Sequence, residues 1–320
     1  MSTAEGSPGG APAGSDAPDR RGAAGVALVA TGAASTQVGA SFAALALPGL
    51  GIPAVVAIRQ LVMALIHLPF AATDLRRAPR RHLWWGVLVA VPLITMNLAI
   101  YGAIREMGVG LAVTIEFLGP LALSVLAARS RIGWLCAVVG FLGMLCVTGP
   151  AGTATLLGTA YGLLSAAGWA AYLAASKAAG IRLGGLAPSA VAAATSAVVL
   201  TPIALLTLDL DRVTWTLLGL AVLAGVLSSA LPYATDVLAL RRLPLSVVST
   251  LMSMHPACAA LAGAVILSER LGAVDIIGLV LISVANAVAV RAARRPPRPP
   301  SLAGQEPGMA HRPTAPEQWG

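Results

Sequence analysis

A glutamate and a proline lie four residues apart within an apolar stretch of this chain, residues 108–120, GVGLAVTIEFLGP. Proline has no backbone N–H, so in a helix Pro120 cannot donate a hydrogen bond to the carbonyl of Glu116. Hydrocarbon does not tolerate an acid beside an unpaired carbonyl unless protein or water covers both groups. We therefore interpret Glu116 as part of a pathway for a polar solute, either as a proton carrier or as the partner of a substrate ammonium group. A structural ion pair with Arg59 is the alternative.

Four further polar side chains fall inside apolar stretches. Arg59 could bind a substrate carboxylate through its planar fork of donors or could serve a structural partner. His255 directly precedes Pro256 and could relay protons or form a buried hydrogen bond. Asn97 and Gln37 could each hydrogen-bond the solute or bond across helices. Pro120 and Pro256 are the predicted gating hinges, because each removes a hydrogen bond from its helix.

Motifs of enzymes are absent from the sequence. It contains no phosphate-binding glycine loop, no G-x-S-x-G elbow and no H-E-x-x-H pair. Its three cysteines lie within apolar runs without metal-ligand spacing. We expect no enzymatic activity, no cofactor and no metal site, so that any transport is driven by a gradient or by the solute's own excess.

Composition places the chain in a membrane. Of its 320 residues 57% are hydrophobic and 11% are charged, and the mean hydropathy is +0.83. A soluble domain of this size needs a more highly charged surface. The net charge of +8 comes from short basic clusters between apolar runs, which argues against a nucleic-acid partner and for contact with the lipid bilayer.

Ten apolar stretches approach the roughly 20 residues that a membrane-spanning helix needs. The predicted spans are 24–46, 52–72, 83–102, 107–128, 132–149, 157–178, 187–208, 214–236, 244–267 and 272–291. Residues 1–22 and 292–320 are rich in Gly, Pro and Ser or in Arg and Pro, and we expect both to be disordered tails. The predicted fold is thus an all-α membrane protein of ten helices.

Basic residues predict the orientation of these spans. With the N-terminus in the cytoplasm, nearly every Lys and Arg falls on the inner side, while Arg105, Arg212 and Arg270 fall outside and Arg59 lies within a span. This is the positive-inside pattern of a multi-pass protein of the cell membrane. We expect both termini to be cytoplasmic. Glu269 and Arg270, in an outer loop, are expected to form a local pair.

The two halves of the chain resemble each other. Residues 103–120 align without gaps to residues 239–256, and the alignment matches Pro120 with Pro256 and Thr114 with Thr250. Five spans per half would make the second repeat, residues 155–291, enter the membrane inverted relative to the first, residues 23–150. Inverted repeats are a hallmark of secondary transporters, whose solute site lies near the midplane between the repeats. Chance similarity between two alanine-rich helices is the alternative.

Several motifs resemble the EamA family of the drug/metabolite transporter superfamily, and within it the threonine and homoserine exporters most closely. The resemblance covers about residues 25–290. Its motifs are residues 115–121 (IEFLGPL), 39–43 (GASFA), Arg59, 96–97 (MN) with Tyr101, 168–172 (GWAAY), 231–233 (LPY), 239–244 (ALRRLP) and 267–271 (LSERL). Tyr101 and Tyr233 join the candidate residues for binding substrate or protons through these motifs. The chain departs from the family's usual glutamates at His255 and Asp236.

The resemblance implies a ten-helix bundle that exports small polar metabolites, most closely amino acids such as threonine or homoserine, by alternating access and proton antiport. We expect a central cavity lined by every span except the fifth and the tenth. A drug effluxer of the same fold is one alternative, against which the 4% aromatic content weighs. A membrane scaffold or sensor that transports nothing is another.

Overall fold

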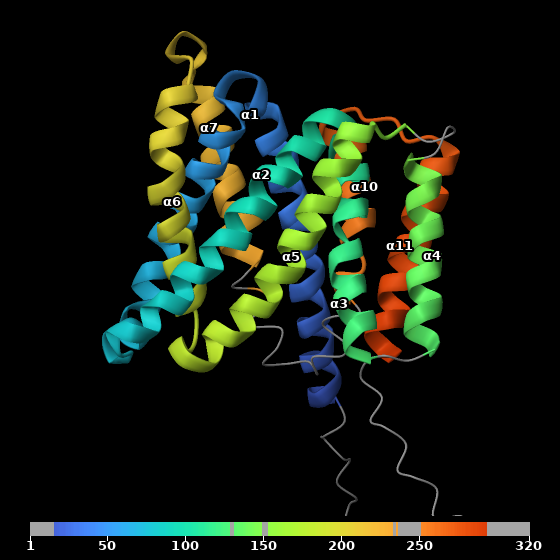
Figure 1. Cartoon of the computed structure of the whole chain (residues 1–320), viewed down its shortest axis with the longest axis horizontal. Helices are drawn as coiled ribbons and strands as arrows, with labels where there is room; N and C mark the ends of the chain where they lie inside the picture. Colours follow the sequence, from blue (N-terminus) through green and yellow to red (C-terminus); the bar gives the residue numbers. More distant parts are fainter. Residues whose placement is uncertain (1–15, 129–130, 149–152, 233–234, 236–250, 293–320) are drawn as a thin grey trace, which may run out of the picture.

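The computed structural model describes residues 16–128, 131–148, 153–232, 235 and 251–292, and within these ranges it contains helices and no strands. Figure 1 shows the helices standing side by side in one bundle. The elements are α1 (Asp16–Arg77), α2 (Arg80–Glu116), α3 (Leu118–Ala128), α4 (Arg131–Thr148), α5 (Leu156–Leu183), α6 (Ala187–Thr207), η1 (Leu210–Arg212), α7 (Trp215–Gly225), η2 (Val226–Ala230), α10 (His255–Ile266) and α11 (Ala273–Ala292). Helix α1 therefore begins inside the stretch expected to be an N-terminal tail.

Six helices of the described part are long and apolar enough, by length and composition, to cross a membrane. They are Ala23–Arg77, Arg80–Leu123, Arg131–Thr148, Leu156–Leu183, Ala187–Thr207 and Ala273–Arg291. Two shorter apolar helices, Trp215–Ala230 and His255–Ile266, accompany them. The chain is thus an all-helical, multi-pass type of protein. The predicted spans 214–236 and 244–267 run into residues outside the described ranges.

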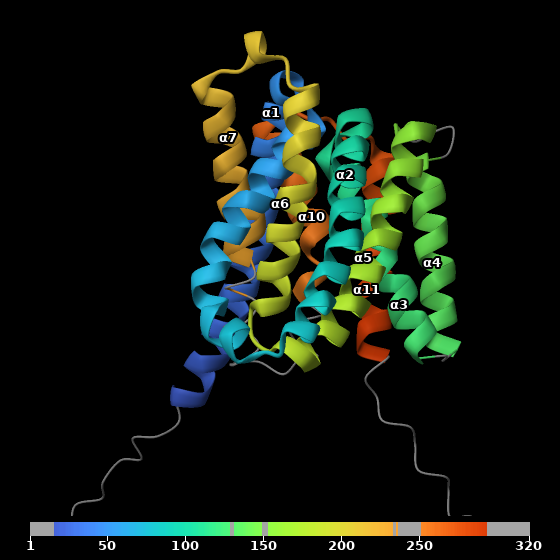
Figure 2. The same ribbon diagram turned by 60° about the vertical axis from the view of Figure 1, so that its left-hand side comes forward.

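Two of the long helices are each broken by a glycine. The backbone is non-helical at Gly51 in α1, with φ +74°, and at Gly108 in α2, with φ +83°. Residues that carry a side chain rarely adopt such φ values, so glycine is required at these turns. Pro53, two residues after Gly51, also disfavours a continuous helix. Each of these helices therefore supplies two arms, in the places where the sequence predicts two separate spans (Figures 1 and 2).

Large apolar side chains cover the outside of the bundle. Phe70, Trp134 and Leu206 are 74%, 64% and 87% exposed, and many leucines and valines of α4, α6 and α11 are exposed with them. A soluble protein rarely shows so much contiguous apolar surface. In a membrane this apolar surface contacts apolar lipid chains, so the distribution agrees with a membrane-embedded chain.

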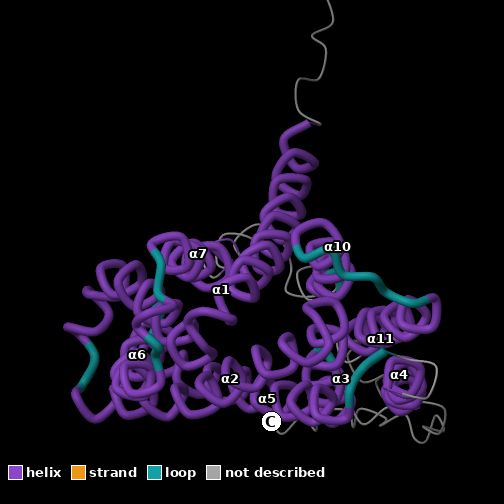
Figure 3. Tube along the Cα trace, turned by 90° about the horizontal axis from the view of Figure 1, so that it is seen from above, coloured by secondary structure: helices purple, strands orange, loops and turns teal. Residues whose placement is uncertain are grey.

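Small residues set how closely the inner helices approach. In the view from above, α5 lies beside α2 and α3 (Figure 3). A Cβ atom on Gly119 would collide with the backbone carbonyl of Ala166, and one on Gly168 would lie 3.0 Å from the Met96 nitrogen. These glycines let the backbone of α5 contact both α2 and α3. Polar side chains of α5 can then reach Glu116 at the end of α2.

Candidate functional site

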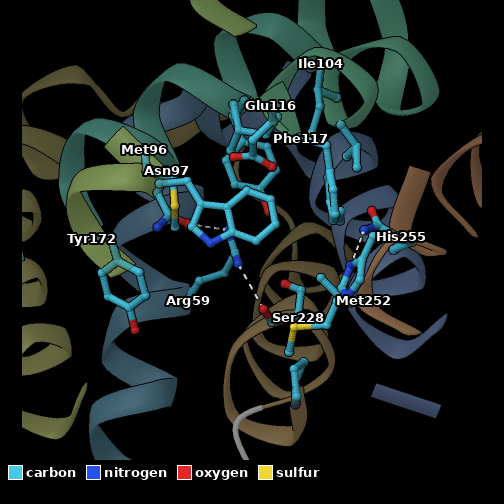
Figure 4. Close-up of a pocket in the computed structure, with 18 of the residues that line it drawn as sticks. Arg59, Met96, Asn97, Ile104, Glu116, Phe117, Tyr172, Ser228, Met252 and His255 are labelled. Atoms are coloured by element: carbon cyan, nitrogen blue, oxygen red, sulfur yellow. Dashed lines mark hydrogen bonds between the residues drawn. The ribbon is translucent and has the colours of Figure 1, made fainter. Parts of the chain in front are cut away.

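A cavity of about 280 Å³ lies among α1, α2, α5, η2 and α10 (Figure 4). It is lined by Thr36, Gln37, Ala40, Arg59, Met96, Asn97, Ile100, Tyr101, Ile104, Val113, Glu116, Phe117, Trp169, Tyr172, Leu173, Ser228, Pro232, Met252 and His255. Six residues singled out in the sequence, at positions 37, 59, 97, 101, 116 and 255, thus meet around one space. Helix α6, which we expected to line the cavity, contributes no residue to it.

Glu116 is the last residue of α2 and faces the cavity. Helix α2 ends here and α3 begins at Leu118, so the break lies at Phe117, directly after the acid rather than one turn beyond it. The missing N–H of Pro120 explains this placement, because the helical ladder loses its donor to the carbonyl of Glu116. Pro120 then occupies the first turn of α3, where a proline is well tolerated.

The partner of Glu116 is a serine from the second half of the chain. The hydroxyl of Ser165, on α5, donates to the Glu116 Oε1 atom. The same hydroxyl lies 3.1 Å from the carbonyl oxygen of Met96. A hydroxyl has one proton and two lone pairs, so Ser165 can donate to a Glu116 carboxylate or accept from a protonated Glu116 while donating to Met96. The site therefore accommodates the acid in either protonation state.

Arg59 is held by neutral groups. It is 6% exposed, and its Nη1 atom donates to Asn97 Oδ1 at 2.9 Å. Its Nη2 atom donates to Ser229 Oγ at 3.0 Å and to the Ser228 carbonyl at 3.4 Å. The guanidinium also lies 5.0 Å from the centre of the Tyr101 ring. The ion pairs of the described residues do not include one between Glu116 and Arg59, so the two charged groups are not in direct contact in this conformation.

The absence of an acid beside Arg59 has a physical consequence. A buried cation is costly unless an anion or several dipoles compensate it. The Nε atom of Arg59 is buried and has no hydrogen-bond partner within the described ranges. Asn97 is itself fixed, because its Nδ2 atom donates to the Leu93 carbonyl at 2.9 Å. Neutral groups thus orient the guanidinium in the cavity wall, and no acid of the described residues bonds it directly.

His255 begins α10 and contacts one residue of α1 and one in the turn between α2 and α3. Its Nδ1 atom lies 3.1 Å from Gln37 Nε2 on α1, and its ring lies 5.5 Å from that of Phe117 between centroids. Figure 4 shows His255 well separated from Arg59, with Glu116 and Phe117 entering from a third direction. The interpretation of His255 as a hydrogen-bonded residue is thus confirmed in its geometry, while a proton-relay role remains a prediction.

Sequence reasoning missed several residues of the cavity wall. Trp169 and Tyr172 of α5 line it, and the Trp169 ring packs edge-on against Phe117 at 4.8 Å between centroids. Ser165, Trp169 and Tyr172 follow helical spacing and so share one face of α5. That spacing is a detectable signal, whereas the serines that bind Arg59 had none. Tyr233 lies outside the described residues.

The outer-loop pair expected between Glu269 and Arg270 is replaced by another contact. The Glu269 carboxylate accepts from the backbone N–H groups of Val109, at 2.8 Å, and Gly110, at 3.3 Å. These donors are the free N–H groups at the start of the second arm of α2, after Gly108. A carboxylate at a helix N-terminus is stabilising, so Glu269 caps this arm. Among the described side chains, no cluster of His, Cys, Asp or Glu could hold a metal ion.

Comparison with known proteins agrees with this architecture. The profile of the EamA-like transporter family matches residues 156–291. The threonine/homoserine exporter RhtA of Salmonella typhimurium is 33% identical over 268 residues, which cover 82% of this chain and 90% of the relative. The exporter of the same name from Escherichia coli K12 is 32% identical over 265 residues, 82% of this chain and 89% of the relative. This chain belongs to the EamA-like transporter family.

A solved structure, titled only "Crystal structure of protein", superposes on the chain with a TM-score of 0.55 at 18% identity. The match covers 88% of this chain and 99% of the solved one, which shows a shared fold. Membership of a transporter family also confirms that the chain is not an enzyme. The cavity is therefore the natural place to look for the transported solute.

Proposed function

We propose that this transporter exports small amino acids, such as threonine or homoserine, by alternating access coupled to proton antiport. The names of the RhtA relatives support the substrate class. A cavity of about 280 Å³ is of a size to hold one small amino acid. The observation that carries the proposal is a buried arginine without an acidic partner, facing the same cavity as a buried acid.

Arg59 is the proposed site for the substrate carboxylate. Asn97, Ser229 and the Ser228 carbonyl hold the guanidinium in place through neutral hydrogen bonds. A substrate carboxylate would supply the missing negative charge, and arginine binds carboxylates with two parallel hydrogen bonds. Tyr101, whose ring lies beside the guanidinium, helps to position it. Tyr233 is proposed to border the solute as well, on the family motif alone.

Glu116 is the proposed site of proton exchange. When ionised it binds the ammonium group of the substrate in the inward-open state. In the outward-open state a proton from outside neutralises the carboxylate, and the substrate leaves because its ammonium group loses its partner. The protonated transporter returns and releases the proton to the cytoplasm. Ser165 supports both states, since its hydroxyl can donate to or accept from the carboxyl group.

Ten helices in two inverted repeats, residues 23–150 and 155–291, are the proposed framework, with both termini in the cytoplasm. Two helix breaks support the repeat. The turn at Phe117 and the turn at Ser253 occupy equivalent positions of the alignment, and each is followed three residues later by a proline, Pro120 or Pro256. We propose that these two breaks are the hinges about which the repeats move. Single cysteines placed in the tails and loops and labelled from one side test the orientation.

Counterflow in proteoliposomes tests the function. Purified protein in liposomes preloaded with unlabelled threonine should accumulate labelled threonine, and should also do so for homoserine. An imposed proton gradient should drive the same solutes uphill. Counterflow with no amino acid from a complete panel would contradict the proposed substrate class.

A second candidate is export of flat aromatic or drug-like compounds. It is favoured by one observation, because Tyr101, Phe117, Trp169 and Tyr172 all line the cavity despite the low aromatic content of the chain. Aromatic walls bind apolar and cationic compounds. Competition of labelled threonine flux by lipophilic cations separates the two candidates. A scaffold or sensor would show no flux of either kind.

A further inference from the structure

Gln37 and His255 form a polar pair in the cavity wall, and Figure 4 shows His255 well apart from Arg59. They come from α1 and α10 and are 218 positions apart in sequence. Gln37 is 3% exposed, yet its Oε1 atom has no hydrogen-bond partner in the described part of the chain. A buried carbonyl oxygen without a partner is costly, so its presence in a cavity wall points to a ligand.

The contact between the two side chains fixes their protons. The Gln37 Nε2 atom lies 3.1 Å from His255 Nδ1, and an amide nitrogen can only donate. The Nδ1 atom must therefore accept, which leaves the ring proton on Nε2. The pair is left with one buried, unpaired acceptor, Gln37 Oε1, and one donor, the His255 Nε2–H group. Phe117 packs against the histidine ring and holds its orientation.

We infer that Gln37 and His255 are a specificity site for a neutral side-chain group that both donates and accepts a hydrogen bond. Such groups are the hydroxyl and the carboxamide. An ammonium group has no lone pair for Nε2–H, and a carboxylate would be repelled by Oε1, so neither charged group satisfies both atoms. This inference rests on the proposed function, in which the α-carboxylate binds Arg59 and the substrate side chain reaches Gln37 and His255.

The pair should reject apolar substrates of the same shape. A valine or leucine side chain would leave both polar atoms unpaired, whereas threonine or asparagine satisfies them. Sites built to hydrogen-bond a substrate group discriminate strongly against analogues that lack it. We expect the wild-type transporter to move threonine at least about tenfold faster than valine at limiting concentration. Asparagine compared with leucine gives the same test for a carboxamide.

Two substitutions test the pair in reconstituted full-length protein. Gln37→Leu removes the amide at similar volume, and His255→Phe removes both ring nitrogens while keeping the ring contact with Phe117. Each should lower the threonine-to-valine flux ratio by about tenfold. Most of this change should come from faster valine flux. Thr114→Val is the matched control. Its hydroxyl is buried outside the cavity lining and donates to the Gly110 carbonyl of its own helix at 2.7 Å, so the ratio should stay at the wild-type value.

The outcomes separate this inference from the proposed function. If wild-type protein moves none of the four amino acids, the proposed function fails. If wild-type protein prefers neither threonine over valine nor asparagine over leucine, or if both variants keep both wild-type ratios, the specificity site is refuted while amino-acid transport stands. Loss of both fluxes in both variants also refutes it, because the pair would then be needed for every solute. A drop in the asparagine-to-leucine ratio without a change for threonine would assign the site to carboxamides.

Discussion

The two helix breaks of this transporter share a geometry and differ in chemistry. At the first, α2 ends at Glu116, a turn lies at Phe117, and Pro120 follows in α3. At the second break, a helix ends at Met252, a turn covers Ser253 and Met254, and α10 begins at His255. Each break is produced by the same cause, a proline that cannot supply the hydrogen bond of its helix.

The side chains at the breaks are not equivalent. Glu116 aligns with Met252, and Gly119 aligns with His255. The first break thus carries an acid with a serine partner, and the second carries an imidazole paired with an amide. The two meet where the Phe117 ring packs against His255. In the proposed mechanism, one break serves the proton and the other serves the solute side chain, and changes at each break test this division.

Glu116→Gln should have the largest effect. The amide keeps the shape of the side chain but cannot release a proton, so threonine efflux driven by a proton gradient should fall at least about 100-fold. Residual exchange should also lose its dependence on pH. The measurement is labelled efflux from proteoliposomes at external pH 5.5 to 8, with protein yield and elution profile as the check on folding.

Moving the acid sharpens the comparison. In a double variant, Glu116→Met with Met252→Glu, the acid lies at the equivalent position of the second break. We expect no recovery of proton-driven flux, because Ser165 serves the first break and the acid would lack that partner. Recovery to wild-type flux would show that the two breaks are interchangeable, contrary to the proposed division.

Ser165→Ala should reduce proton-driven threonine flux by about tenfold, since a hydrogen bond to a charged group contributes roughly 1.5–3 kcal/mol. The loss should appear in flux with a gradient and be smaller in counterflow without one. Ser196→Ala is the control, because Ser196 is also fully buried but donates only to the Ala192 carbonyl of its own helix. Equal effects of the two substitutions would remove Ser165 from the proton step.

Pro120→Ala and Pro256→Ala restore an N–H group at each break. Each should slow transport by roughly three- to tenfold at unchanged stability, because a continuous helix flexes less than a broken one. The comparable substitution Pro202→Ala, within α6, should leave the rate unchanged, since α6 does not line the cavity. Initial rates of counterflow at saturating threonine measure the effect. Wild-type rates in both variants would exclude these breaks as hinges.

Glu269→Gln should have the smallest effect and should act on stability. The break at Gly108 differs from the two above because a carboxylate caps it, through the N–H groups of Val109 and Gly110. Loss of the charge should cost about 1 kcal/mol and lower the Tm in detergent by about 2–4 °C. Glu106→Gln should change the Tm less, because Glu106 forms only a surface ion pair with Arg105. An unchanged Tm for Glu269→Gln would contradict the capping role.

Much of the fold was predictable from local sequence. The apolar stretches around Gly51 and Gly108 were assigned as separate spans, and the structure breaks its long helices at these glycines. The break after Glu116 was predictable from Pro120 alone, although it lies about one turn before the proline rather than at the proline itself. Most candidate site residues do face one cavity, whereas the span 187–208 does not contribute to it, because apolar periodicity cannot say which helices meet.

The sequence by itself determined the membrane character, the places where helices break and the presence of an acid at one break. These features depend on hydrophobicity and on backbone hydrogen bonds, which act over a few residues. Only the tertiary structure decided that Arg59 binds Asn97 and Ser229 rather than Glu116, and that Gln37 meets His255. Such partners depend on how closely whole helices pack, and a shift of a few ångströms between helices exchanges one partner for another.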